Sequence, residues 1–138
     1  MENVTEITVP AEYQGKPVVS VDGYFFGLMR SLKKIATAEN SKYLKSVDGV
    51  LYSSNMTELL SVPADYDKSV TVFRVPESVT TIHSYAFSNN RNIEEIILSD
   101  GITTIPEYAF TECSSLKKVF LPDSVKKICE NAFSYCGA

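Results

Sequence analysis

The sequence is poor in the residue types that metal centres and catalytic sites require. Its 138 residues include one histidine, three cysteines and no tryptophan. A histidine cluster for a metal is therefore excluded, and any Ser-His-Asp or Cys-His site would depend on His83 alone. The scattered acidic residues also supply no recognisable pair for glycoside hydrolysis. The composition argues against an enzyme and predicts no cofactor.

Positive charge and long apolar runs are also lacking. Thirteen basic against 17 acidic residues give a net charge of -4, so no overall field favours nucleic acid or an anionic membrane. No apolar stretch approaches the roughly 18 residues of a membrane-spanning helix. The first residues also show neither the basic nor the apolar region of a signal peptide. We expect one globular domain that binds no nucleic acid and does not insert into a membrane.

Internal repetition is the strongest positive signal. The segments 73–95, 96–118 and 119–138 superimpose without gaps, each starting 23 residues after the one before. The aligned apolar columns are Val75, Leu98 and Leu121; Val79, Ile102 and Val125; Ile82, Ile105 and Ile128; Ala86, Ala109 and Ala132; and Phe87, Phe110 and Phe133. Self-similarity at a fixed period of this length indicates a solenoid of stacked coils.

Two further segments precede the regular repeats. Residues 1–37 carry the same offsets as a diverged first copy with a longer loop. Residues 38–72 depart from the pattern, and the turn signals Asp48-Gly49 and Ser54-Asn55 separate short apolar runs there. We expect a β-hairpin insertion near residues 38–72, within a single domain over residues 1–138.

The spacing within one repeat predicts its local structure. Leu116-x-x-Val119-x-Leu121 places apolar residues on alternate positions of an extended strand, which should line a concave parallel sheet. Pro122 ends that strand, a second short extended piece follows, and the chain turns back at the Ala-Phe pair. The phenylalanines of successive coils should then stack in the core.

The pattern LxxLxLPxSVxxIxxxAFxxC resembles the BspA-like, treponemal-type leucine-rich repeat, and the resemblance covers nearly the whole chain. It is clearest in KKVFLPDSVKKICENAFSYC and EEIILSDGITTIPEYAFTEC. The resemblance implies an α/β leucine-rich-repeat solenoid, mostly β with short helical turns. It also implies a secreted or surface-anchored bacterial protein that adheres to host matrix proteins or to other microbes, and it brings no catalytic residue.

The last repeat stops where the next strand should begin, without a polar capping coil. We therefore expect the chain to be a fragment of a longer protein, with its last repeat truncated. An open end of this kind favours pairing with a second copy, so a homo-oligomer formed through this end is among the expected arrangements. The two functions left open are a protein-binding adhesion module and a structural spacer or self-association module without an external ligand.

Candidate contact residues follow from the outward positions of the predicted coils. The strand column consists of Arg74, Ile97, Phe120 and, at the same offset in the first copy, Ala36. Tyr85 and Tyr108, on the convex turns, form a second set of partner-binding candidates because a tyrosine ring offers both an apolar body and a polar tip.

Cys113 and Cys136 also share a column, one coil apart. Their expected separation is compatible with a disulfide, but stacked side chains point in parallel, which favours reduced thiols. Both states remain open from the sequence.

Overall fold

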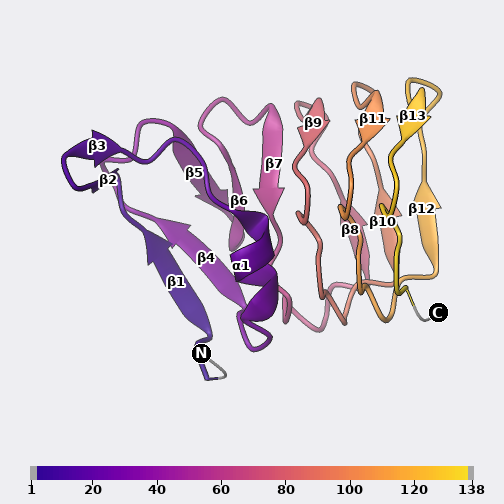
Figure 1. The fold of residues 1–138 in the computed structure, drawn as a ribbon, viewed down its shortest axis with the longest axis horizontal. Coiled ribbons are helices and arrows are strands. Elements are labelled where there is room, and N and C mark those ends of the chain that lie inside the picture. The colour runs from indigo at the N-terminus through magenta and orange to yellow at the C-terminus, as the bar shows by residue number, and fades with distance from the viewer. Residues whose placement is uncertain (1–2, 137–138) are drawn as a thin grey trace.

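The computed structural model describes residues 3–136 as coils stacked along one axis, with the two ends of the chain at opposite ends of the stack (Figure 1). One helix, α1 (Gly23–Leu28), accompanies short strands throughout the described residues. The strands are β1 (Glu6–Val9), β2 (Glu12–Tyr13), β3 (Lys16–Pro17), β4 (Lys34–Thr37), β5 (Leu44–Val47), β6 (Val50–Ser53), β7 (Glu58–Ser61), β8 (Val72–Arg74), β9 (Thr81–Ile82), β10 (Glu95–Ile97), β11 (Thr104–Ile105), β12 (Lys118–Phe120) and β13 (Lys127–Ile128). The mostly β solenoid predicted from the sequence is confirmed.

The first strand of each regular repeat enters one parallel sheet in the order β12-β10-β8. Its register aligns Phe73 with Ile96 and Ile96 with Val119, which reproduces the 23-residue offset of the sequence. The middle residue of each strand faces the core, and Ile96 is only 1% exposed. The alternation read from the LxxLxL spacing is therefore correct.

The second short strand of each repeat stacks in the same way. β7 pairs with β9 and β11 pairs with β13, both in parallel. Leu59 lies opposite Ile82, and Ile105 lies opposite Ile128. This column is buried until the last coil, where Ile128 is 51% exposed.

The segment 38–72 forms the predicted hairpin. β5 and β6 pair antiparallel around Asp48 and Gly49, whose φ angles of 52° and 83° suit a tight two-residue turn. β6 then pairs antiparallel with β7. Because β7 also pairs with β9 at an offset of 23 residues, Leu59 to Ile82, the insertion returns the chain to the stack in register.

The N-terminal coil contains a strand that the sequence analysis overlooked. Val4-x-x-Ile7-x-Val9 follows the repeat spacing, and β1 pairs in parallel with β4 through Ile7 and Ile35. The loop that follows β1 folds into the β2–β3 hairpin. The first coil is thus more regular than its loop suggested.

Ala36 does not join the column of Arg74, contrary to expectation. It pairs with Thr8 in the separate two-stranded sheet β1-β4. The reason is the hairpin, because Ile35 N–H donates to Gly49 O at 2.9 Å and so places the β5–β6 turn beside β4. The parallel sheet predicted across all copies is interrupted at that point.

The core holds the stacked phenylalanines that the repeat predicted. The ring centroids of Phe87 and Phe110 lie 5.0 Å apart, as do those of Phe110 and Phe133. A second apolar cluster around Leu32 and Ile35 fills the N-terminal coils. Within residues 3–136, the helix α1 is too short to cross a membrane, and no other helix is present there.

Candidate functional site

Helix α1 lies against the turns of the first regular coil, residues 73–95, because two of its residues are glycines. A Cβ atom on Gly23 would lie 3.1 Å from the carbonyl oxygen of Ser84, and one on Gly27 would lie 2.1 Å from Ser88 Oγ. Gly23 and Gly27 are four residues apart and therefore share one face of the helix. Larger side chains at these positions would push α1 away from the turn that contains Tyr85.

This close approach joins three tyrosines into a row, which we call the aromatic ladder: Tyr24, Tyr85 and Tyr108. The rings of Tyr24 and Tyr85 meet edge to face with centroids 5.2 Å apart. Those of Tyr85 and Tyr108 stack at 5.0 Å and an interplanar angle of 5°. In the next coil Asn131 takes the tyrosine position, and its Nδ2 lies 3.4 Å from the hydroxyl of Tyr108.

The turns hold the ladder in a defined geometry. Tyr85, Tyr108 and Asn131 have φ angles of 63°, 59° and 59°, in the left-handed region that tyrosine rarely adopts. The same strained position recurs every 23 residues, so the side chains project in parallel from successive coils. Rings ordered in advance lose less conformational entropy when a partner binds.

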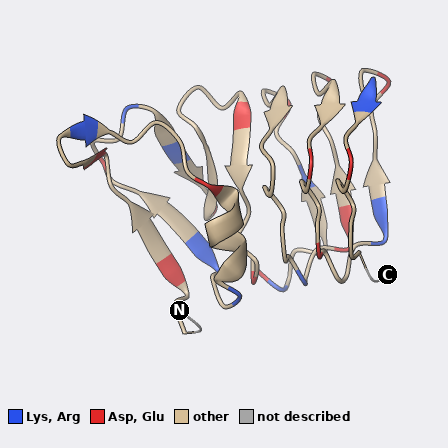
Figure 2. Cartoon of the chain, in the orientation of Figure 1, with Lys and Arg blue, Asp and Glu red and all other residues tan. Residues whose placement is uncertain are grey.

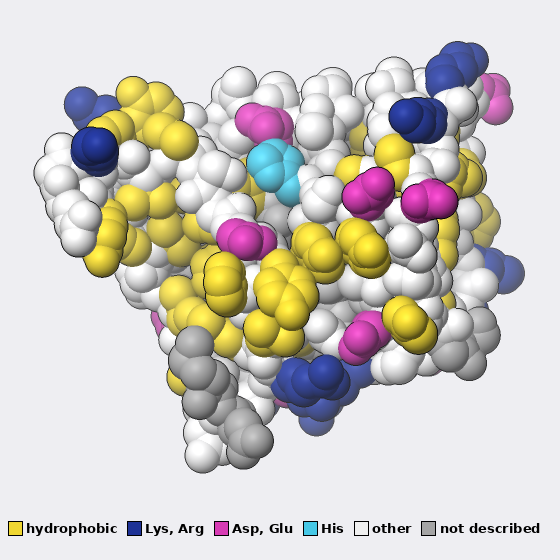
Figure 3. All heavy atoms as spheres, viewed as in Figure 1, with side chains coloured by type: hydrophobic (Ala, Val, Ile, Leu, Met, Phe, Trp, Pro, Cys, Tyr) yellow, Lys and Arg dark blue, Asp and Glu magenta, His cyan; other side chains and the backbone are white. Residues whose placement is uncertain are grey.

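Exposed apolar side chains of α1 extend the ladder. Phe25 is 61% exposed and lies edge to face with Tyr24, and Leu28 is 48% exposed. Figure 3 shows hydrophobic side chains gathered over α1 and the adjoining turns, with acidic side chains above and beside them and Lys or Arg side chains at the lower edge. Contiguous apolar surface on a folded protein typically marks an interaction site.

The strand column predicted from the sequence is also assembled. Arg74 aligns with Ile97, and Ile97 with Phe120, on adjacent strands of the β8-β10-β12 sheet. Phe120 is 47% exposed, Arg74 is exposed and Ile97 is half-buried. This column is therefore available to a partner, although it offers less aromatic surface than the ladder.

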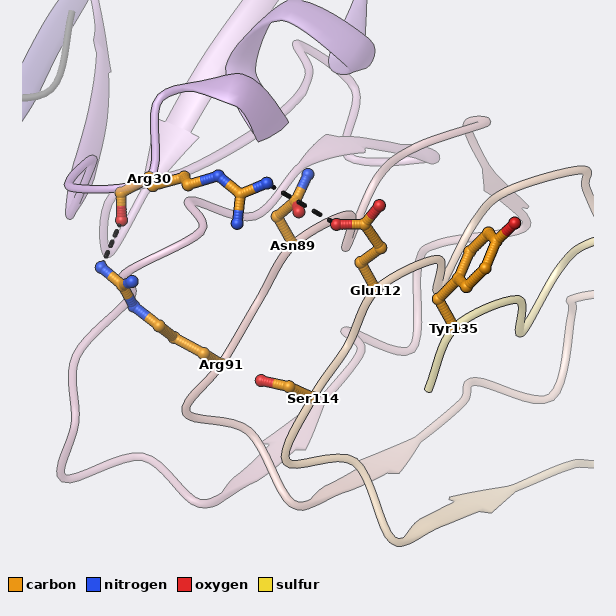
Figure 4. A pocket seen from close by; sticks show the side chains of 6 residues that line it. All are labelled: Arg30, Asn89, Arg91, Glu112, Ser114 and Tyr135. Carbon is orange, nitrogen blue, oxygen red and sulfur yellow. Dashed lines mark hydrogen bonds and ion pairs between the residues drawn. The ribbon is translucent and has the colours of Figure 1, made fainter. Parts of the chain in front are cut away.

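An open pocket of about 410 Å³ lies between the C-terminal end of α1 and the turns of the regular coils (Figure 4). Its lining residues are Arg30, Asn89, Arg91, Glu112, Ser114 and Tyr135. Arg30 faces Glu112 across this pocket, with 3.7 Å between guanidinium nitrogen and carboxylate oxygen. Both side chains are well exposed, so this ion pair contributes little to stability.

Arg91 ties two coils together beside the same pocket. Its guanidinium donates to the carbonyl oxygen of Arg30 at 2.7 Å, and its Nε lies 3.7 Å from a carboxylate oxygen of Asp65. Asp65 is buried and also accepts a hydrogen bond from Asn92. The pocket is thus bordered by a structural connection between the hairpin insertion and the regular repeats.

The residues that could take part in catalysis or metal binding do not gather in one place among the described residues. His83 Nε2 is 2.8 Å from a carboxylate oxygen of Glu58, which joins β7 to the segment after β9. Within residues 3–136, no three histidine, cysteine, aspartate or glutamate side chains gather as a metal site would need.

The cysteines are free in the structure. The thiol of Cys113 donates to the carbonyl oxygen of Phe87 at 3.0 Å, and that of Cys136 donates to Phe110 O at 3.1 Å. The neighbouring Cys136 and burial raise the pKa of Cys113 well above its usual range. Of the two states left open by the sequence, the structure shows the reduced column.

Stacked coils with two parallel strand columns and a phenylalanine core define a leucine-rich-repeat solenoid, a class whose repeats generally mediate protein interactions. The chain belongs to the BspA type leucine rich repeat family, whose model matches six copies over residues 65–138. The family and its fold are generally non-enzymatic. No curated protein matches the chain.

Solved structures of bacterial proteins share the fold. The structure described as the pneumococcal vaccine antigen PcpA is 28% identical, with a TM-score of 0.77, and the match covers 91% of this chain and 29% of that one. A leucine rich cell surface protein from Faecalibacterium prausnitzii is 22% identical, with a TM-score of 0.68 and coverage of 95% and 39%. A leucine-rich repeat protein from Eubacterium ventriosum is 18% identical, with a TM-score of 0.54 and coverage of 97% and 59%.

These likenesses carry different weight. At 22% and 18% identity, the Faecalibacterium and Eubacterium proteins support the fold alone. The chain spans less than two thirds of the length of each of these relatives. Two of them are described as a vaccine antigen and a cell surface protein.

Proposed function

We propose that the chain is the protein-binding module of a secreted or surface-anchored bacterial protein, and that it adheres to host matrix proteins or to proteins on other microbes. The observation that carries this proposal is the aromatic ladder, in which Tyr24 is exposed and Tyr85 and Tyr108 are half-buried, extended by the exposed Phe25. Tyrosine is enriched among the residues that dominate binding energy at protein interfaces. The description of the 28% identical relative as a pneumococcal vaccine antigen supports a surface location.

The chain offers a conservative way to remove the ladder. Asn131 occupies the tyrosine position of its own coil with a φ of 59°, so asparagine fits this backbone. The double variant Tyr85→Asn with Tyr108→Asn therefore removes two rings and keeps the turns. Its matched control is Ile97→Thr with Phe120→Thr, which removes apolar surface from the other candidate column in residues suited to strands.

The test measures binding of the wild-type chain and both variants to a panel of immobilised host matrix proteins. Loss of at least about tenfold in affinity for the ladder variant, with the strand variant unchanged, supports the ladder as contact surface. The reverse pattern would transfer the role to Arg74, Ile97 and Phe120. Failure of the wild-type chain to bind any matrix or microbial surface protein would contradict the adhesion function.

A spacer or self-association module is the second candidate, and the last coil favours it. Leu121 and Ile128 are 44% and 51% exposed, whereas the matching Leu98 and Ile105 are 5% and 0% exposed. Exposed apolar columns beside an open strand edge favour pairing with another coil. Sedimentation of the wild-type chain across a range of concentrations, compared with Leu121→Lys and Ile128→Lys together, tests this role. A monomer at every concentration would exclude self-association, and binding of the monomer to a matrix or microbial protein would exclude a spacer without an external ligand.

The domain division remains part of this proposal. One domain over residues 1–138 comprises the first copy 1–37, the hairpin variant 38–72 and the regular repeats 73–95, 96–118 and 119–138. Residues 137 and 138, at the end of the last repeat, lie outside the described residues.

A further inference from the structure

Acidic residues run beside the aromatic ladder. Glu107 directly precedes Tyr108 of the ladder. Glu130 directly precedes Asn131, which takes the tyrosine position in the next coil, and both glutamates are exposed. The 23-residue spacing places these glutamates on successive coils, as it does the rings, and Figure 2 shows acidic segments side by side on the neighbouring coils of β11 and β13. The ladder therefore has a negative row along one side.

The start of α1 adds to this charge. The carboxylate of Asp22 accepts a hydrogen bond from the backbone N–H of Tyr24 at 2.9 Å, so it lies at the first ring of the ladder. The pKa of Tyr85 is raised, chiefly because the side chain is partly buried. Four neighbouring groups raise it further, in the order Tyr108, Tyr24, Asp22 and Glu107. Negative charge from both directions thus acts on the middle of the ladder.

These acids are not neutralised by ion pairs within the part of the chain that the structure describes. The five ion pairs found there use other carboxylates, at Glu6, Glu58, Asp65, Glu94 and Glu112. Asp22, Glu107 and Glu130 consequently keep their charges available to a partner. Like charges on that partner would be repelled, and opposite charges would be attracted and oriented.

We propose that the aromatic ladder and its acidic border, defined as Asp22, Glu107 and Glu130, bind a cationic amphipathic segment of the partner protein. Apolar side chains of that segment cover Phe25 and the solvent-accessible parts of the ladder rings, and its lysines or arginines meet the border. This inference rests on the proposed protein-binding function and adds the chemistry of the partner. Acidic or uncharged partners fit the same rings less well, because they leave three carboxylates uncompensated.

Two of the three charges of the border can be removed without disturbing the fold. Glu107→Gln with Glu130→Gln removes two charges from exposed side chains and leaves Asp22, which caps α1, intact. The matched control is Glu77→Gln with Asp100→Asn, which removes the same charge from exposed residues that precede β9 and β11. Any general effect of net charge appears equally in both variants.

The probes are synthetic amphipathic helices of about 15 residues. One carries leucines on one face and lysines on the other, and a second has glutamate in place of every lysine. A third keeps the lysines but has serine in place of every leucine. Binding to the full chain is measured by anisotropy of a fluorophore on the peptide, at salt concentrations from about 0.05 to 0.5 M.

The lysine-leucine peptide is expected to bind the wild-type chain at least about tenfold more tightly than either other peptide, and to weaken with salt. Glutamine at the border should weaken it about fivefold, and the control variant should not. Equal binding of the glutamate peptide, or equal effects of border and control variants, would overturn the cationic partner.

Failure of this inference is distinct from failure of the proposed function. If Tyr85→Asn with Tyr108→Asn abolishes binding to matrix proteins while the peptides show no preference for lysine, the function stands and the cationic partner is wrong. If the lysine-leucine peptide binds but the tyrosine variant retains all affinity for it, the ladder is not the surface used, and the inference is also overturned.

Discussion

The rings of Phe87 and Phe110 stack 5.0 Å apart, one coil above the other, and neither side chain is exposed to solvent. Their separation is close to the spacing of neighbouring strands, about 4.8 Å, because the same coil geometry sets both. Each regular coil therefore buries its phenylalanine only when its neighbours are in place. The solenoid depends on contacts between coils more than on contacts within one.

Phe110→Ala is expected to lower the free energy of unfolding by about 3 to 5 kcal/mol, because it leaves a cavity between two stacked rings. Phe110→Leu, which fills most of the space, should lower it by less than half of that. Urea unfolding followed by circular dichroism measures both. A loss below about 1 kcal/mol for Phe110→Ala would mean that the coils do not rely on the phenylalanine column.

Gly27→Ala is expected to destabilise the chain by about 1 to 3 kcal/mol, although alanine favours a helix over glycine by about 1 kcal/mol. The added Cβ would lie 2.1 Å from Ser88 Oγ. Ser88→Ala removes that oxygen, so the double variant should recover most of the loss. The coupling between the two substitutions, from thermal or urea unfolding, measures the contact directly. A Gly27→Ala variant as stable as the wild type would contradict this account of how α1 docks.

Cys113 is expected to resist alkylation in the folded chain, while Cys129 and Cys136 react. The side chain of Cys113 is 2% exposed. The neighbouring Cys136 and burial raise the pKa of Cys113, which disfavours the reactive thiolate. Mass spectrometry of peptides after timed labelling at pH 8 distinguishes the sites. Without reductant, the unfolded chain should label at all three thiols, whereas a disulfide between Cys113 and Cys136 would leave one.

Arg91→Ala is expected to lower the free energy of unfolding by about 1 to 3 kcal/mol. The variant loses the 2.7 Å hydrogen bond to the carbonyl of Arg30 and leaves the buried carboxylate of Asp65 with fewer partners. Arg91→Lys should recover only part of this, because one ammonium cannot match a planar guanidinium that contacts two groups. Arg30→Ala serves as control, since its own side chain makes only an exposed ion pair. Equal losses of unfolding free energy for Arg91→Ala and Arg30→Ala would contradict a stabilising role for the contacts of Arg91.

Much of the fold follows from local sequence periodicity. The 23-residue columns predicted the strand register, the phenylalanine stack and the alignment of Cys113 with Cys136, because a repeating coil places equivalent residues side by side. The Asp48-Gly49 turn was equally predictable, since few other pairs suit its two positive φ angles. The strand β1, Glu6–Val9, was missed because the long loop after it hid the repeat, although the spacing Val4-x-x-Ile7-x-Val9 was visible.

The two candidate contact surfaces were also predictable only in part. The sequence by itself determined that Tyr85 and Tyr108 align, and that Arg74, Ile97 and Phe120 share a column, because both follow from the repeat length. Only the tertiary structure decided that Tyr24 completes the ladder and that Ala36 leaves the column. Those outcomes depend on where α1 and the hairpin dock, and docking is set by close packing between segments far apart in the chain, such as Gly27 against Ser88 and Ile35 against Gly49. Periodicity within one segment carries no information about such contacts.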